Sequence, residues 1–314
     1  MMKILIAGEL NVDLVLQNCS ALPRLGKEVL AEDASPTLGG ASAICAAGLA
    51  RLGNRVGFVS KVGTDVFGDF CVGELSRFNI DISTTLRDSF IKTGITVSIS
   101  CAQDRALVTY LGSIAALRAS DISEATLGAY CHLHISSFFL QQELRPDLKS
   151  LFASAHRHGL TTSLDPGFDP SEQWGSDIVD VLSEVDIFLP NEVELELITG
   201  VREKIQALRA LQNGRTMTVV KLGPAGCMAI EKDDIVSVPA FPVKALDTTG
   251  AGDSFNAGFL HSWLGEKNLK KAMRFGAACG ALSTQRLGGT ANQPSESEVN
   301  QFLRQTRESI ESGT

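Results

Sequence analysis

Seven consecutive residues, Asp247-Thr248-Thr249-Gly250-Ala251-Gly252-Asp253, combine small and acidic side chains just before a helix that the sequence predicts from about Ser254. The small residues leave backbone N–H groups uncovered, and these groups together with the helix dipole favour an anion. Asp253 lies at the edge of this turn, where its carboxylate could accept a proton beside the anion. An anion-binding turn next to a base is what phosphoryl transfer to an alcohol requires.

A glycine-rich turn whose aspartates only cap the helix is the alternative interpretation. A run of seven matching residues is more specific than a single glycine-rich turn, however. D-T-T-G-A-G-D resembles the C-terminal signature of the ribokinase-like (PfkB-type) carbohydrate kinase family. The resemblance implies that Asp253 is the base that removes the proton of the acceptor hydroxyl. It also implies that the amides of Gly250, Ala251 and Gly252 stabilise charge on the transferring phosphoryl group.

A first predicted strand at residues 3–7 ends shortly before Asp13, and open α/β sheets bind their ligands beyond the carboxyl ends of strands. A solvated loop aspartate is the alternative. In the resembled family, the aspartate of an N-x-D motif binds sugar hydroxyls. That resemblance assigns substrate binding to Asp13 and places Asn11 beside it.

The pair Gly39-Gly40 precedes a predicted helix of small residues and begins a segment that resembles the N-terminal signature of the family. Backbone without side chains permits hinge motion or the close approach of a ligand, so both glycines are assigned to the acceptor site. One position departs from the signature. Family members usually carry an asparagine that contacts sugar where this chain has Ile44, and the change makes the expected pocket more apolar.

Asn191 and Glu194 follow a predicted strand, and helix capping alone would explain both. They also match the family's N-x-x-E motif, in which the glutamate orders the water shell of Mg²⁺ near the nucleotide phosphates. Lys221 precedes a turn that resembles the nucleotide-contacting G-x-x-G segment, with Gly223 and Gly226 in the glycine positions. Two further residues complete the expected ATP site: Thr248 and Ala278.

The resemblance also implies a K⁺ ion beside the anion-binding turn. The corresponding oxygens, mostly of the backbone, fall in this chain on Asp247, Thr249, Ser283, Arg286, Gly288 and Asn292. A monovalent cation at that place would order the turn.

Several sugar-acid and fructose kinases of the family carry D-P-N-x-R where this chain has Asp165-Pro166-Gly167-Phe168-Asp169. Gly167 and Asp169 therefore replace the asparagine and the arginine. Without that guanidinium, a carboxylated sugar loses a partner at this point.

From about residue 112 the predicted strands and helices alternate, which indicates a doubly wound, mostly parallel sheet. The family resemblance implies that this sheet belongs to a ribokinase-like three-layer α/β/α fold. Residues 94–100 and 106–111 alternate apolar and polar side chains, as half-exposed antiparallel strands do. With short strands expected at 14–16 and 28–31, they predict a small β-sheet lid.

We assign residues 1–12, 37–88 and 112–314 to an α/β core that binds nucleotide and substrate, and residues 13–36 and 89–111 to the lid. Exposed strand edges on such a lid often pair with a second subunit, so a homodimer through the lid is expected.

The net charge of −8 argues against nucleic acid or an anionic membrane as the main partner. Seven cysteines are scattered singly without a C-x-x-C pair, as reduced thiols of a cytoplasmic protein would be. The amino-terminal residues predict a strand rather than a signal peptide, and no apolar run approaches the roughly 20 residues of a membrane span. The pairs His132/His134 and His156/His158 lack a further ligand at metal-binding spacing, so we interpret them as buried or surface histidines.

These observations predict an ATP-dependent kinase that uses Mg²⁺ to phosphorylate a primary hydroxyl of a sugar or sugar derivative. The absence of G-x-x-x-x-G-K-[ST] excludes a P-loop kinase. A nucleoside kinase on the same fold is the first alternative, because Ile44 and the lid residues Phe90, Leu107 and Tyr110 suit a nucleobase. A sugar-binding protein without turnover is the second, although the intact Asp253 counts against it.

Overall fold

The structure is a computed structural model that describes residues 2–101, 105–285, 288–290 and 292–312. An eight-stranded sheet forms its centre, in the order β14-β13-β12-β11-β10-β9-β1-β4. The six strands from β12 to β4 are parallel, and β13 and β14 extend the sheet in antiparallel pairing. The strands are β1 (Lys3–Ala7), β4 (Arg55–Val59), β9 (His132–Ile135), β10 (Thr161–Leu164), β11 (Ile187–Phe188), β12 (Met217–Lys221), β13 (Cys227–Glu231) and β14 (Asp234–Val238).

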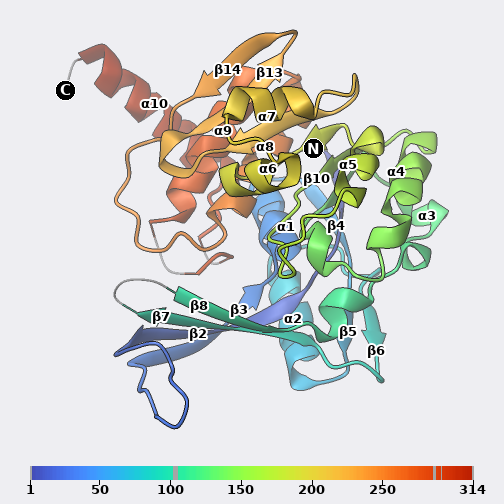
Figure 1. Cartoon of the computed structure of the whole chain (residues 1–314), viewed down its shortest axis with the longest axis vertical. Coiled ribbons are helices and arrows are strands. Elements are labelled where there is room, and N and C mark those ends of the chain that lie inside the picture. Colours follow the sequence, from blue (N-terminus) through green and yellow to red (C-terminus); the bar gives the residue numbers. More distant parts are fainter. Residues whose placement is uncertain (1, 102–104, 286–287, 291, 313–314) are drawn as a thin grey trace.

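Both faces of this sheet are buried, because successive side chains of a strand point to opposite sides. In β1, Ile4 and Ile6 join one apolar cluster, whereas Leu5 and Ala7 join another. The first cluster contains residues of α1 (Ala41–Arg51), α2 (Val66–Arg77), α8 (Ala251–Glu266) and α9 (Leu269–Ser283). The second contains residues of α3 (Glu124–Leu127), α4 (Leu148–Arg157), α5 (Asp177–Val181), α6 (Glu192–Thr199) and α7 (Lys204–Ala210). The result is the expected three-layer α/β/α arrangement (Figure 1).

A second, four-stranded sheet has the order β3-β2-β7-β8 and stands apart from the main sheet (Figure 1). Its strands are β2 (Asn11–Cys19), β3 (Asp33–Gly39), β7 (Gly94–Cys101) and β8 (Arg105–Tyr110). We call it the lid sheet. The strand expected at residues 28–31 is wrong: β3 runs over 33–39 instead, although it contains Pro36. Proline is tolerated there because β3 is an edge strand.

The remaining elements are short or peripheral. They are the parallel pair β5 (Lys61–Gly63) and β6 (Leu86–Asp88), the helix α10 (Glu296–Ser312), and 3-10 turns at Gly112–Ala116, Ala119–Asp121, Phe138–Leu140, Arg145–Asp147, Leu182–Glu184 and Gly223–Ala225. In the described part of the chain, no helix has the length and apolar character needed to cross a membrane.

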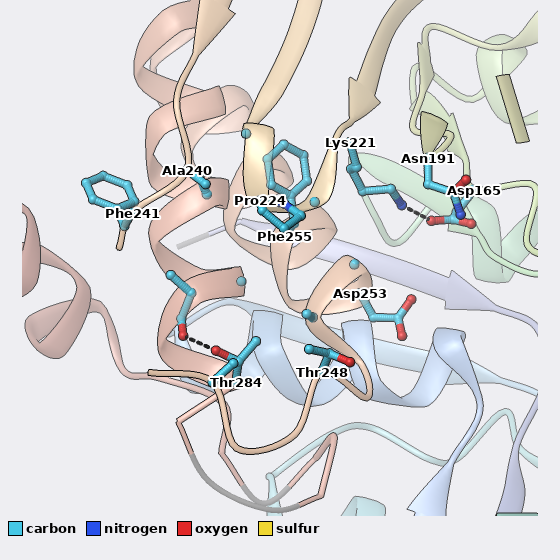
Figure 2. A pocket seen from close by; sticks show the side chains of 18 of the residues that line it. Asp165, Asn191, Lys221, Pro224, Ala240, Phe241, Thr248, Asp253, Phe255 and Thr284 are labelled. Carbon is cyan, nitrogen blue, oxygen red and sulfur yellow. Dashed lines mark hydrogen bonds and ion pairs between the residues drawn. The ribbon is translucent and has the colours of Figure 1, made fainter. Parts of the chain in front are cut away.

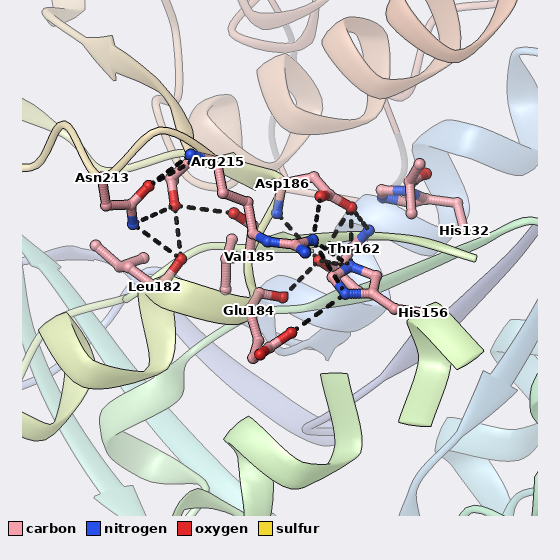
Figure 3. A network of polar contacts seen from close by, with 11 residues as sticks. His132, His156, Thr162, Leu182, Glu184, Val185, Asp186, Asn213 and Arg215 are labelled. Carbon is pink, nitrogen blue, oxygen red and sulfur yellow. Dashed lines mark hydrogen bonds and ion pairs between the residues drawn. The ribbon is translucent and has the colours of Figure 1, made fainter. Parts of the chain in front are cut away.

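A polar network ties together the amino ends of β10, β11 and β12 (Figure 3). The carboxylate of Asp186 accepts hydrogen bonds from the Thr162 amide at 2.8 Å and from the Arg215 guanidinium at 3.1 Å. His156 of α4 lies 3.1 Å from Asp186 and 3.3 Å from Glu184. These contacts fix the end of the sheet that lies opposite the site described next.

Candidate active site

Five polar side chains lie at the carboxyl ends of neighbouring parallel strands. Glu9 follows β1, Ser137 follows β9, Asp165 follows β10, Asn191 follows β11, and Lys221 ends β12. Each of the five lines one or both of two adjoining cavities. Because parallel strands bring their carboxyl ends to one edge, residues more than 200 positions apart meet there.

The larger cavity has a volume of about 830 Å³ and the smaller of about 480 Å³. Ala41, Ser137 and Asp253 line both, so the two cavities meet at these residues. Asp253 lies in the first turn of α8 and is half-buried. Burial, with a smaller contribution from the Asp165 carboxylate, raises the pKa of Asp253 to about 8. A group at this junction can take a proton from a molecule in one cavity while it faces a molecule in the other.

The turn before α8 has the conformation that an anion site requires. Gly250 has a left-handed φ of 73°, and α8 begins at Ala251, one turn earlier than the sequence suggested. The first-turn amides of Gly252 and Asp253 therefore have no carbonyl of their own helix to bond. The Ala251 amide differs, because it donates to the carbonyl of Thr248 at 3.2 Å.

Ile44 packs directly against this turn. A methyl group placed on Gly250 would lie 3.0 Å from the Ile44 side chain, and one on Gly289 would lie 2.9 Å from it. The residue that departs from the family signature thus supports the turn and contributes to the wall of the smaller cavity.

Lys221 carries a buried positive charge in the larger cavity (Figure 2). Its ammonium group lies 2.6 Å from Asp165 and 3.2 Å from the Asn256 amide oxygen. Burial on its own would lower the pKa of Lys221, but attraction to Asp165 holds this pKa above its ordinary value. A methyl group on Gly252 would lie 3.6 Å from the ammonium nitrogen, so this charge lies beside the anion-binding turn.

The rest of the larger cavity is mainly apolar. Figure 2 shows Phe241 and Ala240 in a different part of the view from Lys221. The apolar lining residues include Phe168, Pro224, Ala240, Phe241, Pro242, Val243, Ala245, Phe255, Ala277 and Ala281. Such a cavity offers charge at one place and a flat apolar wall elsewhere, which suits a nucleotide.

The structure supports both the helix-capping and the nucleotide-site interpretation of Asn191 and Glu194. Their side chains and amides form a reciprocal capping box at the start of α6, with hydrogen bonds of 2.8 and 2.9 Å. Both residues also line the larger cavity. Burial, with a smaller effect of the Asp165 charge, raises the pKa of Glu194 to about 7.

Most residues predicted to contact ATP line the larger cavity, including Gly223, Gly226 and Thr248. Ala278 is the exception, because its side chain is fully buried in an apolar cluster with Phe241 and Phe275. The helical period of α9 turns its neighbours Ala277 and Ala281 to the cavity instead. Ala278 therefore does not line the cavity to which the sequence assigned it.

The smaller cavity brings together three of the four residues predicted to bind the acceptor, and Gly39 is not part of its lining. Asn11, Asp13 and Gly40 line it, and the Asn11 amide donates to the Asp13 carboxylate at 2.8 Å. A methyl group on Gly39 would lie 2.1 Å from that carboxylate, and one on Gly40 would lie 2.9 Å from Asn11 and from Glu9. The glycine pair is required because the polar side chains lie directly against it.

Glu9 is a site residue that sequence reasoning missed. Its carboxylate is 2% exposed and lines the smaller cavity. It accepts four hydrogen bonds: from the Ser42 amide at 3.2 Å, the Ser42 hydroxyl at 2.7 Å, the Ser137 hydroxyl at 2.7 Å and the Gln141 amide at 3.2 Å. Burial nevertheless raises the pKa of Glu9 above its ordinary value. A glutamate directly after a buried strand was the available signal.

The lid sheet presents hydroxyl groups to the smaller cavity: those of Ser35, Thr37, Thr96, Ser98, Ser100 and Thr109. Leu107 also lines it, as expected. Phe90 and Tyr110 were expected in this pocket, but both are mostly exposed and neither belongs to its lining. Among the described lining residues there is no aromatic side chain.

Only some of the described residues predicted to bind K⁺ are connected to one another by hydrogen bonds. Asp247 accepts from the amides of Thr249 at 2.8 Å and Gly288 at 2.9 Å, and the Asn292 amide donates to the carbonyl of Gly288 at 3.1 Å. The Ser283 hydroxyl instead donates to Gly280 within its own helix. Arg286 lies outside the described residues.

Asp169 lines neither of the two cavities. It accepts hydrogen bonds from Ser171, Gln173 and Trp174 and so closes its own loop. Gly167 does line the larger cavity, next to Ser137.

A three-layer α/β core, a lid sheet and a carboxylate shared by two cavities beside an anion-binding turn define an enzyme that transfers a charged group to a second molecule. The chain belongs to the pfkB family of carbohydrate kinases, whose family model matches residues 1–296. It is therefore a phosphotransferase with an alcohol group as acceptor.

Curated relatives agree with this family. The chain is 29% identical to a ribokinase of Staphylococcus aureus (strain COL), over 95% of this chain and 99% of the ribokinase. It is 30% identical to fructokinase-1 of Zea mays, over 84% and 88%, respectively. It is also 29% identical to an ATP-dependent ribose-1-phosphate kinase of Halopiger xanaduensis, over 96% and 98%.

Solved structures show the same fold. A ribokinase from Thermotoga maritima superimposes with a TM-score of 0.83 at 26% identity, over 97% of this chain and all of that chain. A fructokinase double mutant from Vibrio cholerae O395, with fructose, ADP and potassium bound, gives a TM-score of 0.80 at 26% identity, over 96% and 98%.

Proposed function

We propose that this kinase transfers the γ-phosphate of ATP to a primary hydroxyl group of a sugar. The observation that carries the proposal is the position of Asp253, which lines both cavities. In this assignment the nucleotide occupies the larger cavity and the sugar the smaller one. Asp253 removes the proton of the sugar hydroxyl as that oxygen attacks the γ-phosphorus, and ADP leaves into the larger cavity.

The first turn of α8 and Lys221 supply positive potential on the side of the larger cavity. The amides of Gly252 and Asp253 and the ammonium group of Lys221 stabilise the negative charge of the transferring group. Gly250 shapes the turn, and Ala251 contributes to the cavity wall.

The donor set fits Mg²⁺ bound largely through phosphates and water. Among the described residues there is no group of three or more His, Cys, Asp or Glu side chains arranged to hold a metal by themselves. Glu194 provides one buried carboxylate beside the larger cavity, which is enough to orient the ion's water shell. When bound with ATP, Mg²⁺ neutralises phosphate charge. For K⁺, we propose oxygens of Asp247, Thr249, Gly288 and Asn292 as donors, together with those of Ser283 and Arg286.

A sugar suits the smaller cavity better than a nucleoside. Asp13, Asn11 and the hydroxyl groups of the lid sheet offer hydrogen-bond partners for a polyol. The described lining has no aromatic ring on which a nucleobase could stack.

We further propose that residues 1–12, 37–88 and 112–314 act as the core and 13–36 and 89–111 as the lid. Val108 and Tyr110 of the edge strand β8 are more than half exposed and would support a homodimer through the lid. We propose a cytoplasmic location, without membrane or nucleic acid as a partner.

The test is ADP release from ATP and Mg²⁺ with a panel of pentoses, hexoses, sugar acids and nucleosides. Asp253→Asn should reduce kcat on the active sugar by about 10²- to 10⁴-fold, because the amide cannot accept the proton. Asp234→Asn, which changes an exposed aspartate of β14, is the matched control and should keep full activity. Wild-type turnover by Asp253→Asn would exclude this residue as the base. Sugar binding without any turnover would favour a sugar-binding protein.

A further inference from the structure

A buried carboxamide joins the anion-binding turn to the part of the chain that follows α9. Gln293 is 4% exposed, and its amide nitrogen donates to the Ser254 hydroxyl at 2.8 Å and to the Gly289 carbonyl at 2.7 Å. The Ser254 hydroxyl donates in turn to the Gly250 carbonyl at 2.8 Å. Because a hydroxyl group has one proton, donation runs in a single direction, from Gln293 through Ser254 to Gly250.

The second acceptor of Gln293, the carbonyl of Gly289, belongs to a residue that lies against the same turn. A methyl group on Gly250 would lie 3.1 Å from the Cα of Gly289, and one on Gly289 would lie 3.5 Å from the Thr249 carbonyl oxygen. Gly289 also lines the smaller cavity. The two N–H bonds of Gln293 therefore connect the turn to the wall of the acceptor cavity.

The Gly250 carbonyl determines how α8 begins. It accepts from both the amide and the hydroxyl of Ser254, each at 2.8 Å. The carbonyl of a residue that directly precedes a helix accepts the first hydrogen bond of that helix, so its orientation sets the direction of the first-turn amides. In α8 these include the amides of Gly252 and Asp253.

The oxygen of the same carboxamide is buried without a hydrogen-bond partner among the described residues. It lies against α1, where a methyl group on Gly48 would be 2.6 Å away. Turning the amide over would place this oxygen against the Gly289 carbonyl, so only the observed orientation permits both donated bonds. Burial of an unpaired oxygen opposes folding and offsets what those bonds contribute to stability.

We infer that Gln293 is a positioning residue for phosphoryl transfer, which acts through Ser254 and Gly289. It holds the turn so that the amides of Gly252 and Asp253 meet the transferring group. The inference rests on the proposed function and extends it to a side chain that lines neither cavity.

Gln293→Met keeps a side chain of similar length and removes both donors. On the sugar that the full chain uses best, kcat should fall by about 10- to 100-fold, because the turn amides act on charge that develops in the transition state. KM for ATP and KM for the sugar should stay within about twofold. Rates are measured by ADP release well below the melting temperature of the variant. An unaltered kcat, or a loss carried by KM alone, overturns the inference.

Thr162→Val is the matched control for lost stability. Thr162 is fully buried at the opposite end of the sheet, and its hydroxyl donates to the Glu184 carbonyl at 3.0 Å. The control should lower the melting temperature and leave kcat unaltered. An equal fall of kcat in Thr162→Val, at the same loss of melting temperature, would show general destabilisation and overturn the inference.

Ser254→Ala tests the same connection with a smaller change and does not depend on the folding of Gln293→Met. It should also lower kcat by about tenfold or more, and an unaltered kcat overturns the role of Ser254. In the double variant, kcat should fall by less than the product of the two single effects, because both side chains act on one carbonyl. A fall equal to that product would show that the two residues act independently and overturn the connection.

Binding separates this inference from the kinase proposal. If no sugar is turned over, the kinase proposal fails, and affinities for ADP and for the β,γ-imido analogue of ATP are compared by calorimetry with Mg²⁺. Gln293→Met should then reduce the preference for the analogue by about tenfold relative to wild type, because the turn no longer meets the third phosphate. The same preference in both proteins overturns the inference.

Discussion

The ammonium group of Lys221 and the amide of Asn256 both lie 2.6 Å from the same carboxylate oxygen of Asp165, and the side chains of Lys221 and Asp165, which line the larger cavity, are only 12% and 6% exposed. This oxygen is the anchor for the positive charge beside the anion-binding turn. Burial would raise the pKa of Asp165, but attraction to Lys221 holds it below its ordinary value, so the pair remains ionised.

Lys221→Met should destabilise the protein by about 3–5 kcal/mol, because it leaves the Asp165 carboxylate buried without its cation. The measurement is the free energy of unfolding in denaturant. The double variant Lys221→Met/Asp165→Asn should recover most of the loss, since no unpaired charge remains. Equal stability of the single and double variants would contradict the ionised pair.

The rate should depend on pH through Asp253. A general base acts in its ionised form, and the pKa of this group is raised to about 8. We therefore expect kcat/KM to increase with pH up to about 8 and then level off, because kcat/KM reports ionisation of the free enzyme. Lys221 lowers the pKa of Asp253, so Lys221→Gln should move the midpoint to higher pH. A flat profile from pH 6 to 9 would speak against Asp253.

Gly39→Ala should impair acceptor binding selectively. The added methyl group would lie 2.1 Å from Asp13 and 2.7 Å from Asn11, so both side chains must move. We expect KM for the sugar to rise by about 10- to 100-fold while KM for ATP changes little. Gly73→Ala, in a helix with open space around the new methyl group, is the control. If KM for the sugar and KM for ATP rose by the same factor, the substitution would have distorted the whole active site instead.

A chain of buried hydrogen bonds connects His132 and His134 through the hydroxyl of Ser163, at 2.7 Å on each side. Burial lowers the pKa of His134 to about 4, so the folded protein keeps this imidazole neutral. The unfolded chain takes up a proton below about pH 6.5, and the stabilising contribution is therefore present above that pH and lost as the pH falls toward 4.

His134→Gln removes this titration. The difference in unfolding free energy between wild type and the variant should shrink by about 3 kcal/mol as the pH falls from 6.5 to 4. Taking the difference cancels the contribution of Asp253 and Glu194, whose raised pKa values act in the opposite direction. A difference that stays constant with pH would show that His134 does not titrate in this range.

The sequence predicted the layers of the fold and much of the site because those features are local. The alternation of strands and helices indicated the α/β/α fold, now supported by the family and by solved structures. The turn at 247–253 is one short segment of the chain, and the capping pair Asn191/Glu194 lies in another. The conformation of each therefore follows from neighbouring residues.

The missed features depend on contacts between distant segments. Glu9 meets Ser137 and Gln141 only after β9 pairs with β1. Tyr110 was misjudged because hydrophobicity alone does not reveal which face of the strand β8 turns inward, and Phe90 because it lies in the loop between β6 and β7 rather than in a lid strand. Ala278 was assigned to the cavity in error because, in a run of small residues, the sequence does not show which side chains of a helix face the core and which face a cavity.

The junction of the two cavities at Ala41, Ser137 and Asp253 has a consequence for inhibitor design. A compound that links an adenosine phosphate to a sugar would span the three residues that the two cavities share. Joining two weak ligands in this way raises the effective concentration of the second, so affinity can exceed that of either part by about 10²- to 10⁴-fold. The best tether would be as short as the transferred phosphate itself.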